Sequence, residues 1–266
     1  MPLPCFAVPE AERWLRVVGV GSDPQWTIIC FPYAGSGGSV FGAWSRCVPG
    51  GLSVLAVQLP GREDRLAEPA IVNGLDLDRR LIPLLAPLLN GRVAFFGHSL
   101  GALIAFRLAH RLERVHRLQI QHLFVSARRA PRIESPASRL FGLEHRAFVT
   151  RLGELGGLPK AVLDSPELMD VVLPALRGDL MLSRQLERDG LAAAEPFAIS
   201  APITGFAGLV DVSVPGEYVR AWAAHTRSGF RLHHIEGDHF FLRRRGQLLL
   251  ELMRHELTAK NGRRAA

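Results

Sequence analysis

A serine flanked by glycines, in the sequence Gly-His-Ser-Leu-Gly at residues 97–101, constrains the fold more than any other feature of the chain. The apolar strand pattern Val93–Phe96 precedes it, and a helical pattern over Leu100–Arg114 follows. A sharp turn between a strand and a helix exposes its central residue. The residues two positions before and after it pass so close to neighbouring elements that only glycine fits there. The motif therefore predicts that Ser99 is a nucleophile at the head of a helix, beside a parallel sheet.

Strand patterns alternate with helix patterns along most of the chain. Near-continuous apolar character in several of the strands indicates a sheet that is buried on both faces. We predict strands at Thr27–Phe31, Ser53–Gln58, Val93–Phe96, His122–Ser126, Pro202–Phe206 and Arg231–Ile235, and helices at Leu75–Leu89, Leu100–Arg114, Gly216–His225 and Gln247–Leu257. This order predicts one α/β domain over residues 1–266, with a mostly parallel central sheet flanked by helices.

The alternation stops between residues 130 and 196, where the pattern is helical and no strand is predicted. The run Asp-Ser-Pro-Glu at residues 164–167 is typical of a helix start, because it combines a capping side chain, an early proline and an acidic first turn. Pro174 is expected to kink or break that helix. We interpret residues 130–196 as a helical lid inserted between strands and lying over the strand ends. The alternative is that these helices only cover the core.

Ten histidines compete for the role of the base that activates Ser99. His239 follows the last predicted strand and precedes the last helix, in the sequence Gly-Asp-His-Phe-Phe, which is where a loop-borne base belongs. His233 and His234 lie inside a strand, and His98 faces away from the site if the turn is sharp. The sequence therefore predicts His239 as the base.

An acidic residue is expected between the nucleophile and the base in the chain. Asp211 follows the predicted strand Pro202–Phe206 and precedes His239 by 28 residues, which is enough for one helix and one strand. Asp179 and Asp189 fall within the predicted lid. We therefore predict that Asp211 orients the imidazole and stabilises its charged form. The order serine, aspartate, histidine is that of the α/β-hydrolase fold.

Two backbone amides are needed to bind the oxyanion that forms when a serine attacks a carbonyl group. Leu100, directly after the nucleophile, is expected to supply one of them. The other is expected from the glycine-rich loop after the first predicted strand, with Ala34 preferred over Tyr33. This loop has neither the spacing nor the lysine of a phosphate-binding loop. The chemistry predicted here requires no metal ion and no cofactor.

The chain carries a formal net charge of +7, and 30 of its 32 basic residues are arginines, since Lys160 and Lys260 are the only lysines. The arginines are spread along the chain and form no basic stripe with interleaved aromatic residues. Nucleic acid is therefore not an expected partner. The positive charge leaves open the possibility that the partner is an acidic protein.

We expect a cytoplasmic protein that is a monomer and does not bind membranes. The apolar runs are shorter than the roughly 18 residues of a membrane-spanning helix. The N-terminal residues carry no secretory signal. Three cysteines, at positions 5, 30 and 47, have no metal-ligand spacing and indicate a reducing compartment.

Several separated blocks resemble the type II thioesterases, the stand-alone editing hydrolases of polyketide and nonribosomal peptide synthesis. The resemblance covers roughly residues 27–253 and rests on residues 31–35 (Phe-Pro-Tyr-Ala-Gly), 58–62 (Gln-Leu-Pro-Gly-Arg), 96–101 (Phe-Gly-His-Ser-Leu-Gly), 155–159 (Leu-Gly-Gly-Leu-Pro), 173–179 (Leu-Pro-Ala-Leu-Arg-Gly-Asp) and 237–242 (Gly-Asp-His-Phe-Phe-Leu). There are two departures. Tyr33 stands where many members carry histidine, and residues 208–210 lack the acidic residue often found before the catalytic aspartate.

The resemblance implies an enzyme that hydrolyses aberrant or stalled acyl groups from the phosphopantetheine arm of acyl or peptidyl carrier proteins. It would act in trans and without a cofactor. Ser99 would attack the thioester to form an acyl-enzyme, and His239 would activate the water that releases the acid. Arg62, in the second block, has two open interpretations: a structural salt bridge, or a contact to the substrate or to the pantetheine phosphate.

Three other functions are alternatives to this one. A carboxylesterase or lipase that acts on free oxyesters needs the same nucleophile, base and oxyanion hole. A medium-chain acyl-carrier-protein thioesterase would set the length of a released product. A catalytically idle α/β-hydrolase that serves as a binding module is the alternative from another class, and the presence of Ser99, Asp211 and His239 together argues against it.

Overall fold

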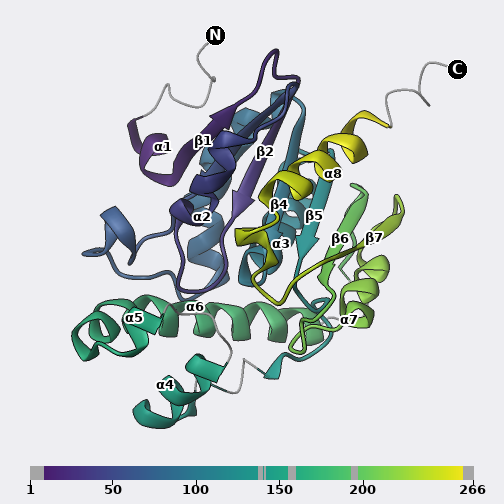
Figure 1. Ribbon diagram of the computed structural model, residues 1–266. Coiled ribbons are helices and arrows are strands. Elements are labelled where there is room, and N and C mark those ends of the chain that lie inside the picture. Colours follow the sequence, from purple (N-terminus) through teal and green to yellow (C-terminus); the bar gives the residue numbers. More distant parts are fainter. Residues whose placement is uncertain (1–8, 137–139, 141, 155–159, 193–196, 260–266) are drawn as a thin grey trace, which may run out of the picture.

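Six parallel strands and one antiparallel edge strand form the sheet in the part of the chain that the structure describes. This computed structural model describes residues 9–136, 140, 142–154, 160–192 and 197–259. The strand order across the sheet is β1-β3-β2-β4-β5-β6-β7, with β1 antiparallel to β3 (Figure 1). The strands are β1 (Leu15–Val20), β2 (Trp26–Phe31), β3 (Leu52–Val57), β4 (Val93–His98), β5 (His122–Ser126), β6 (Ile203–Gly208) and β7 (Phe230–Ile235).

Helices and short 3-10 segments connect the strands. The α-helices are α1 (Pro9–Trp14), α2 (Gly74–Leu85), α3 (Leu100–His116), α4 (His145–Glu154), α5 (Lys160–Leu163), α6 (Pro166–Ala192), α7 (Gly216–Arg220) and α8 (Gly246–Thr258). The 3-10 segments are η2 (Gly38–Arg46), η3 (Glu63–Arg65), η4 (Ala86–Asn90), η6 (Ala221–His225) and η7 (Phe241–Arg243). Among the residues described, none of the helices is long and apolar enough to cross a membrane.

Both faces of the sheet are covered by helices. Along β2, Ile29 and Phe31 pack into one core with α2 and α3, whereas Ile28 and Cys30 pack into a second core with η2 and α8. All four side chains are fully buried. Successive side chains of a strand point to opposite faces, so a continuous apolar strand fills both cores. This division confirms the prediction of a sheet that is buried on both sides.

The six predicted strands are all present, and their ends differ from the predictions by no more than two residues. The predicted helices Leu75–Leu89 and Gly216–His225 each divide into an α-helix and a following 3-10 segment. The sequence patterns do not predict β1. This strand lies at the edge of the sheet, and most of its residues are partly exposed, so it lacks the apolar continuity of the central strands.

Three helices, α4, α5 and α6, occupy the described part of the chain between β5 and β6. The longest, α6, has 27 residues and runs across the end of the sheet where the parallel strands finish (Figure 1). Its buried side packs on α4 through Met169, Leu173, Leu176, Leu180 and Phe148. The lid over residues 130–196 stays a prediction, and its residues 137–139, 141, 155–159 and 193–196 lie outside the described residues.

Of the two predicted effects of Pro174, a kink or a break in the lid helix, the break does not occur. The helix begins at Pro166, within the predicted start, and continues through Pro174 to Ala192. The Oγ atom of Ser165 accepts a hydrogen bond from the amide of Leu168 at 3.2 Å, which caps the first turn. Pro174 and Asp170, one turn earlier, are both exposed, so water can bind the carbonyl group of Asp170, to which proline has no N–H to donate.

Candidate active site

Ser99 lies in a strained turn between β4 and α3. Its backbone φ is +52°, a conformation that residues other than glycine rarely adopt and that clusters at functional sites. A Cβ atom at Gly97 would lie 2.3 Å from the carbonyl oxygen of Gly101, and one at Gly101 would lie 2.1 Å from that of Phe31. The close approach of these backbone segments therefore requires both glycines of the motif.

His239 and Asp211 meet at the carboxyl ends of two neighbouring strands. Asp211 follows β6 and His239 follows β7, and these strands pair in parallel. The Nδ1 atom of His239 lies 2.7 Å from Oδ2 of Asp211. The other carboxylate oxygen accepts hydrogen bonds from the hydroxyl and amide of Ser213, at 2.6 and 2.9 Å, and from the amide of Val214 at 3.0 Å. The carboxylate is therefore held by four donors.

These donors keep Asp211 ionised and fix the tautomer of His239. Burial by itself raises the pKa of Asp211, but the hydrogen bond and charge of His239, with the hydrogen bonds from Ser213 and Val214, outweigh it and lower the pKa to about 2. An ionised carboxylate can only accept hydrogen bonds, so Nδ1 of His239 carries a proton. In the neutral ring Nε2 is then unprotonated, which is the form that a general base requires.

His98 faces away from the nucleophile and supports His239 from behind. Its ring is fully buried, with Nε2 2.8 Å from the carbonyl oxygen of His239 and Nδ1 2.9 Å from Oγ of Ser126. A carbonyl oxygen can only accept, so Nε2 donates and Nδ1 accepts from the serine hydroxyl. Burial, followed by the nearby charge of His239, lowers the pKa of His98 to about 3. His98 is therefore a neutral support for the loop that carries His239.

A cavity of about 360 Å³ lies between Ser99 and the helices above the sheet, and His239 also lines it. Most of its other walls are apolar and come from the loops that follow the strands, from the segment before α4, and from α4 and α6: Ala127, Leu140, Leu152, Leu176, Leu180, Val212, Val214 and Phe240. Arg128 is a polar exception, since its buried guanidinium donates to Oγ of Ser183 at 2.9 Å and pairs with Glu187 of α6. The cavity suits an apolar group whose reacting carbon reaches Ser99.

The two predicted oxyanion donors line this cavity as well. Ala34 belongs to the loop after β2, and Leu100 is the first residue of α3. Within the described ranges, neither amide donates a hydrogen bond to another protein group. The geometry thus brings Ser99, Asp211, His239, Ala34 and Leu100 together at one place, and their catalytic roles stay predictions.

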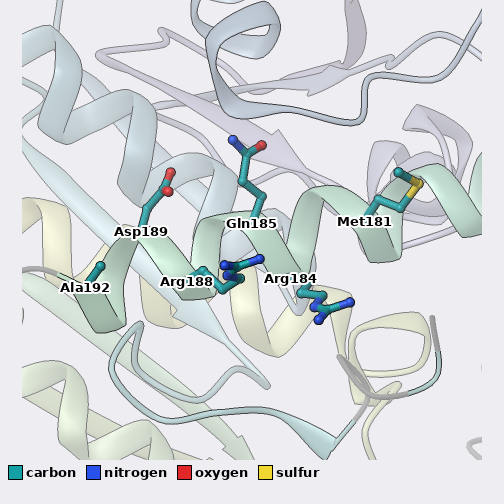
Figure 2. A pocket seen from close by; sticks show the side chains of 6 residues that line it. All are labelled: Met181, Arg184, Gln185, Arg188, Asp189 and Ala192. Atoms are coloured by element: carbon teal, nitrogen blue, oxygen red, sulfur yellow. The ribbon is translucent and has the colours of Figure 1, made fainter. Parts of the chain in front are cut away.

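A second hollow lies on α6 and shares no residue with the cavity at Ser99. It is lined by Met181, Arg184, Gln185, Arg188, Asp189 and Ala192 (Figure 2). Figure 2 shows Gln185 and Asp189 on one side of the helix and the two arginines on another. Oε1 of Gln185 accepts from the amide of Gly74 at 3.0 Å, and Asp189 pairs with Arg107 at 3.2 Å. These contacts fasten α6 to α2 and α3.

Two polar contacts of the site are absent from the sequence predictions. An aspartate followed two residues later by serine is typical of a turn in which the carboxylate accepts from local amides, so a signal for Ser213 is present in the sequence. No local signal exists for Arg243, whose Nη2 and Nε donate to the hydroxyl of Tyr33 at 2.5 and 3.0 Å. The Tyr33 ring in turn contacts Phe240 edge to face, beside His239.

The model of the Thioesterase domain family matches residues 26–257. The chain belongs to the thioesterase family. It is therefore a hydrolase that acts on thioesters.

Individual relatives match over most of their length. The gramicidin S biosynthesis protein GrsT of Aneurinibacillus migulanus is 36% identical over 252 residues, which cover 94% of this chain and 96% of that protein. The medium-chain S-acyl fatty acid synthase thioesterase of Rattus norvegicus is 31% identical, with 88% of each chain covered. The structure of BorB, a type II thioesterase from the borrelidin biosynthetic cluster, is 32% identical with a TM-score of 0.78, over 92% of this chain and 97% of its own. These similarities confirm the α/β-hydrolase fold and the resemblance to type II thioesterases.

Proposed function

We propose that this thioesterase is a stand-alone type II enzyme that removes aberrant or stalled acyl groups from the phosphopantetheine arm of carrier proteins in polyketide or nonribosomal peptide synthesis. The observation that carries the proposal is the arrangement of Ser99, His239 and Asp211 beside an apolar cavity. The similarity to GrsT and BorB supports the class of pathway. The proposed chemistry uses side chains and backbone amides of this chain alone.

Acylation begins when Oγ of Ser99 attacks the carbonyl carbon of the thioester. Nε2 of His239 takes the hydroxyl proton, and the ionised Asp211 stabilises the resulting imidazolium through Nδ1. The carbonyl oxygen becomes an oxyanion, which accepts hydrogen bonds from the amides of Ala34 and Leu100. Collapse of this intermediate breaks the carbon–sulfur bond, and the departing pantetheine sulfur takes the proton from His239.

Deacylation repeats the same steps with water as the nucleophile. His239 takes a proton from water, whose oxygen attacks the acyl carbon and forms a second oxyanion in the same hole. Collapse breaks the ester bond to Ser99 and returns the proton to its Oγ. The products are a free carboxylic acid and a carrier protein with a free pantetheine thiol.

The substrate is proposed to arrive on a separate carrier protein, so that the enzyme acts in trans, as a monomer in the cytoplasm. Carrier domains are typically acidic, and the net charge of +7 would attract them before docking. Added salt is therefore expected to raise the KM for an acylated carrier protein. An unchanged KM between low and high salt would contradict electrostatic steering.

We also propose that residues 130–196 act as a lid that shapes the acyl cavity. The described helices of this segment supply Leu152, Leu176 and Leu180 to the cavity wall. An acyl group bound to Ser99 would therefore pack against the lid as well as against the sheet.

The test of the proposed function compares two substrates with the same short acyl group: an acylated carrier protein and a nitrophenyl oxyester. Both are measured with the wild-type enzyme and with Ser99→Ala. A much higher kcat/KM on the carrier thioester, abolished by the substitution, is the expected result. Preference for the oxyester, with the carrier left acylated, would make this enzyme an esterase.

Release of medium-chain products is the second candidate function, because the rat medium-chain fatty acid synthase thioesterase is 31% identical to this chain. A series of acyl lengths on one carrier protein separates the two functions. An editing enzyme is expected to accept short groups as well as longer ones. A chain-terminating enzyme would show a sharp maximum at medium length.

A further inference from the structure

Two sequence blocks that the triad does not use meet in a buried ion pair. Arg62, in the turn after β3, is 5% exposed, and Asp179, in α6, is fully buried. Nη1 of Arg62 lies 2.5 Å from Oδ2 of Asp179, and Nη2 lies 3.0 Å from Oδ1. The guanidinium also donates to the carbonyl oxygen of Pro60, at 3.1 and 3.0 Å. The guanidinium of Arg62 thus makes two hydrogen bonds to the Asp179 carboxylate and two to the Pro60 carbonyl oxygen, which supports the salt-bridge interpretation.

The same carboxylate holds the loop that carries Ala34. Oδ2 of Asp179 accepts a hydrogen bond from the amide of Gly35 at 2.7 Å. Gly35 has a φ of +77°, and a Cβ atom there would lie 3.1 Å from Cδ1 of Leu176 in α6. The backbone next to Ala34 therefore lies directly against α6, and only a glycine allows this approach without strain.

Gln58 fixes the other end of the loop. Its Oε1 atom accepts a hydrogen bond from the amide of Gly38 at 2.7 Å, and its Nε2 donates to the carbonyl oxygen of Arg62 at 3.2 Å. The Gln58 side chain is fully buried. The loop is thus held at Gly35 and at Gly38, and both attachments connect to Arg62.

We propose that Asp179 and Arg62 are positioning residues that set the direction of the Ala34 amide and so couple α6 to the oxyanion hole. The inference rests on the proposed function, because it assumes that Ala34 stabilises an oxyanion formed at Ser99. The amide of Gly35 belongs to a rigid peptide plane, and only the φ and ψ of Ala34 separate that plane from the Ala34 amide. Anchoring the Gly35 amide therefore restricts the direction in which the Ala34 amide points.

The consequence is that α6 does more than cover the acyl group. Asp179 projects from the lid helix, whereas Ala34 and Arg62 belong to loops at the ends of strands. Movement of α6 away from the sheet would separate the carboxylate from Gly35 and release the loop. A complete oxyanion hole therefore requires α6 to be in the position seen here.

Asp179→Asn and Arg62→Lys test this proposal. Asparagine keeps one acceptor oxygen but loses the charge, and lysine keeps the charge but cannot bridge two oxygens in the manner of arginine. Removing an oxyanion donor costs about 100- to 1,000-fold in kcat. Because the amide would be misdirected and not deleted, we expect kcat to fall about 10- to 100-fold, with KM near the wild-type value.

The inhibition constant of a trifluoromethyl ketone analogue of the acyl group distinguishes a positioning role from a merely structural one. The analogue forms a tetrahedral adduct with Ser99 whose oxyanion occupies the hole. Its inhibition constant is expected to rise by the same factor by which kcat falls. Glu256→Gln is the matched control, because Glu256 in α8 is also a buried carboxylate paired with an arginine, Arg231 in β7, and among the described residues neither of the two contacts α6. This control is expected to lower the melting temperature and to leave kcat and the inhibition constant unchanged.

The outcomes separate this inference from the proposed function. Folded Asp179→Asn and Arg62→Lys variants with wild-type kcat and inhibition constant would overturn the inference, as would an equal loss of both in Glu256→Gln. If Asp179→Asn does not fold, Arg62→Lys alone decides. Wild-type activity of Ser99→Ala on the carrier thioester would instead refute the proposed function.

Discussion

The substitution His98→Gln is expected to make the stability of this protein less sensitive to mild acid. The His98 side chain is fully buried, and burial lowers its pKa from 6.5 to about 3. Between these two pH values the unfolded chain binds a proton that the folded chain does not bind. Stability therefore falls as the pH falls. The contribution of His98 is fully present above pH 6.5 and is lost progressively toward pH 3.

The magnitude follows from the size of the shift. Each pH unit within this window costs about 1.4 kcal/mol. Lowering the pH from 7.5 to 5.0 therefore costs about 2 kcal/mol through His98 alone. Burial also lowers the pKa of His110 and of His225, but both residues remain in the variant and act equally in the two proteins. Glutamine does not titrate, and it keeps an N–H donor for the carbonyl oxygen of His239.

The assay is urea unfolding, followed by circular dichroism, of wild type and His98→Gln at pH 7.5 and at pH 5.0. The wild-type protein is expected to lose about 2 kcal/mol more than the variant between these conditions. An equal loss in the two proteins would refute the reasoning, because a buried neutral His98 must contribute to the wild-type difference.

Three further substitutions test other contacts of the site. Asp211→Asn puts the catalytic imidazole in the wrong tautomer, so kcat on a carrier thioester is expected to fall about 10⁴-fold with the fold intact; a loss below about tenfold contradicts the assigned role. Arg128→Met breaks the buried ion pair between Arg128 and Glu187 and is expected to cost about 3–5 kcal/mol in urea unfolding. Adding Glu187→Leu should restore most of that loss, and a double variant as unstable as the single one rules the explanation out. Gly101→Ala places a Cβ atom 2.1 Å from a backbone carbonyl oxygen, so Tm and the rate of labelling by a fluorophosphonate should both drop, and wild-type values of both would disprove the steric argument.

The positions of the three predicted triad residues could be inferred from the sequence because each of them depends on local features of the chain. The turn at Ser99 is marked by two glycines, a strand before it and a helix after it. Asp211 and His239 each follow a strand, and the carboxyl ends of neighbouring parallel strands lie at one edge of a sheet. Strand order alone therefore brings the acid and the base together.

The contacts of α6 could not be predicted in this way. Arg62 and Asp179 are separated by 117 residues, and no periodicity relates them. Placing Asp179 in the lid excluded it as the catalytic acid, and nothing in its own segment indicates that it binds Gly35. The continuation of α6 through Pro174 depends on exposure of that side of the helix, which is a property of the folded chain.

The edge strand β1 could not be predicted from the sequence pattern either. Only Leu15 of its six residues is buried, Arg16 and Gly19 interrupt its apolar run, and it pairs antiparallel to β3 on one side only. A strand that contributes few side chains to the core has a weak apolar pattern. Prediction was therefore accurate for the centre of the sheet, which positions the site, and failed at the edge.

The most direct test of the proposed function is the intact mass of an acylated carrier protein before and after incubation with this enzyme. Wild-type enzyme should convert the carrier to the form with a free pantetheine thiol, and the Ser99→Ala variant should leave it acylated. A carrier that stays acylated with the wild-type enzyme, or that is cleared equally by the variant, would contradict a serine thioesterase acting on carrier-bound acyl groups.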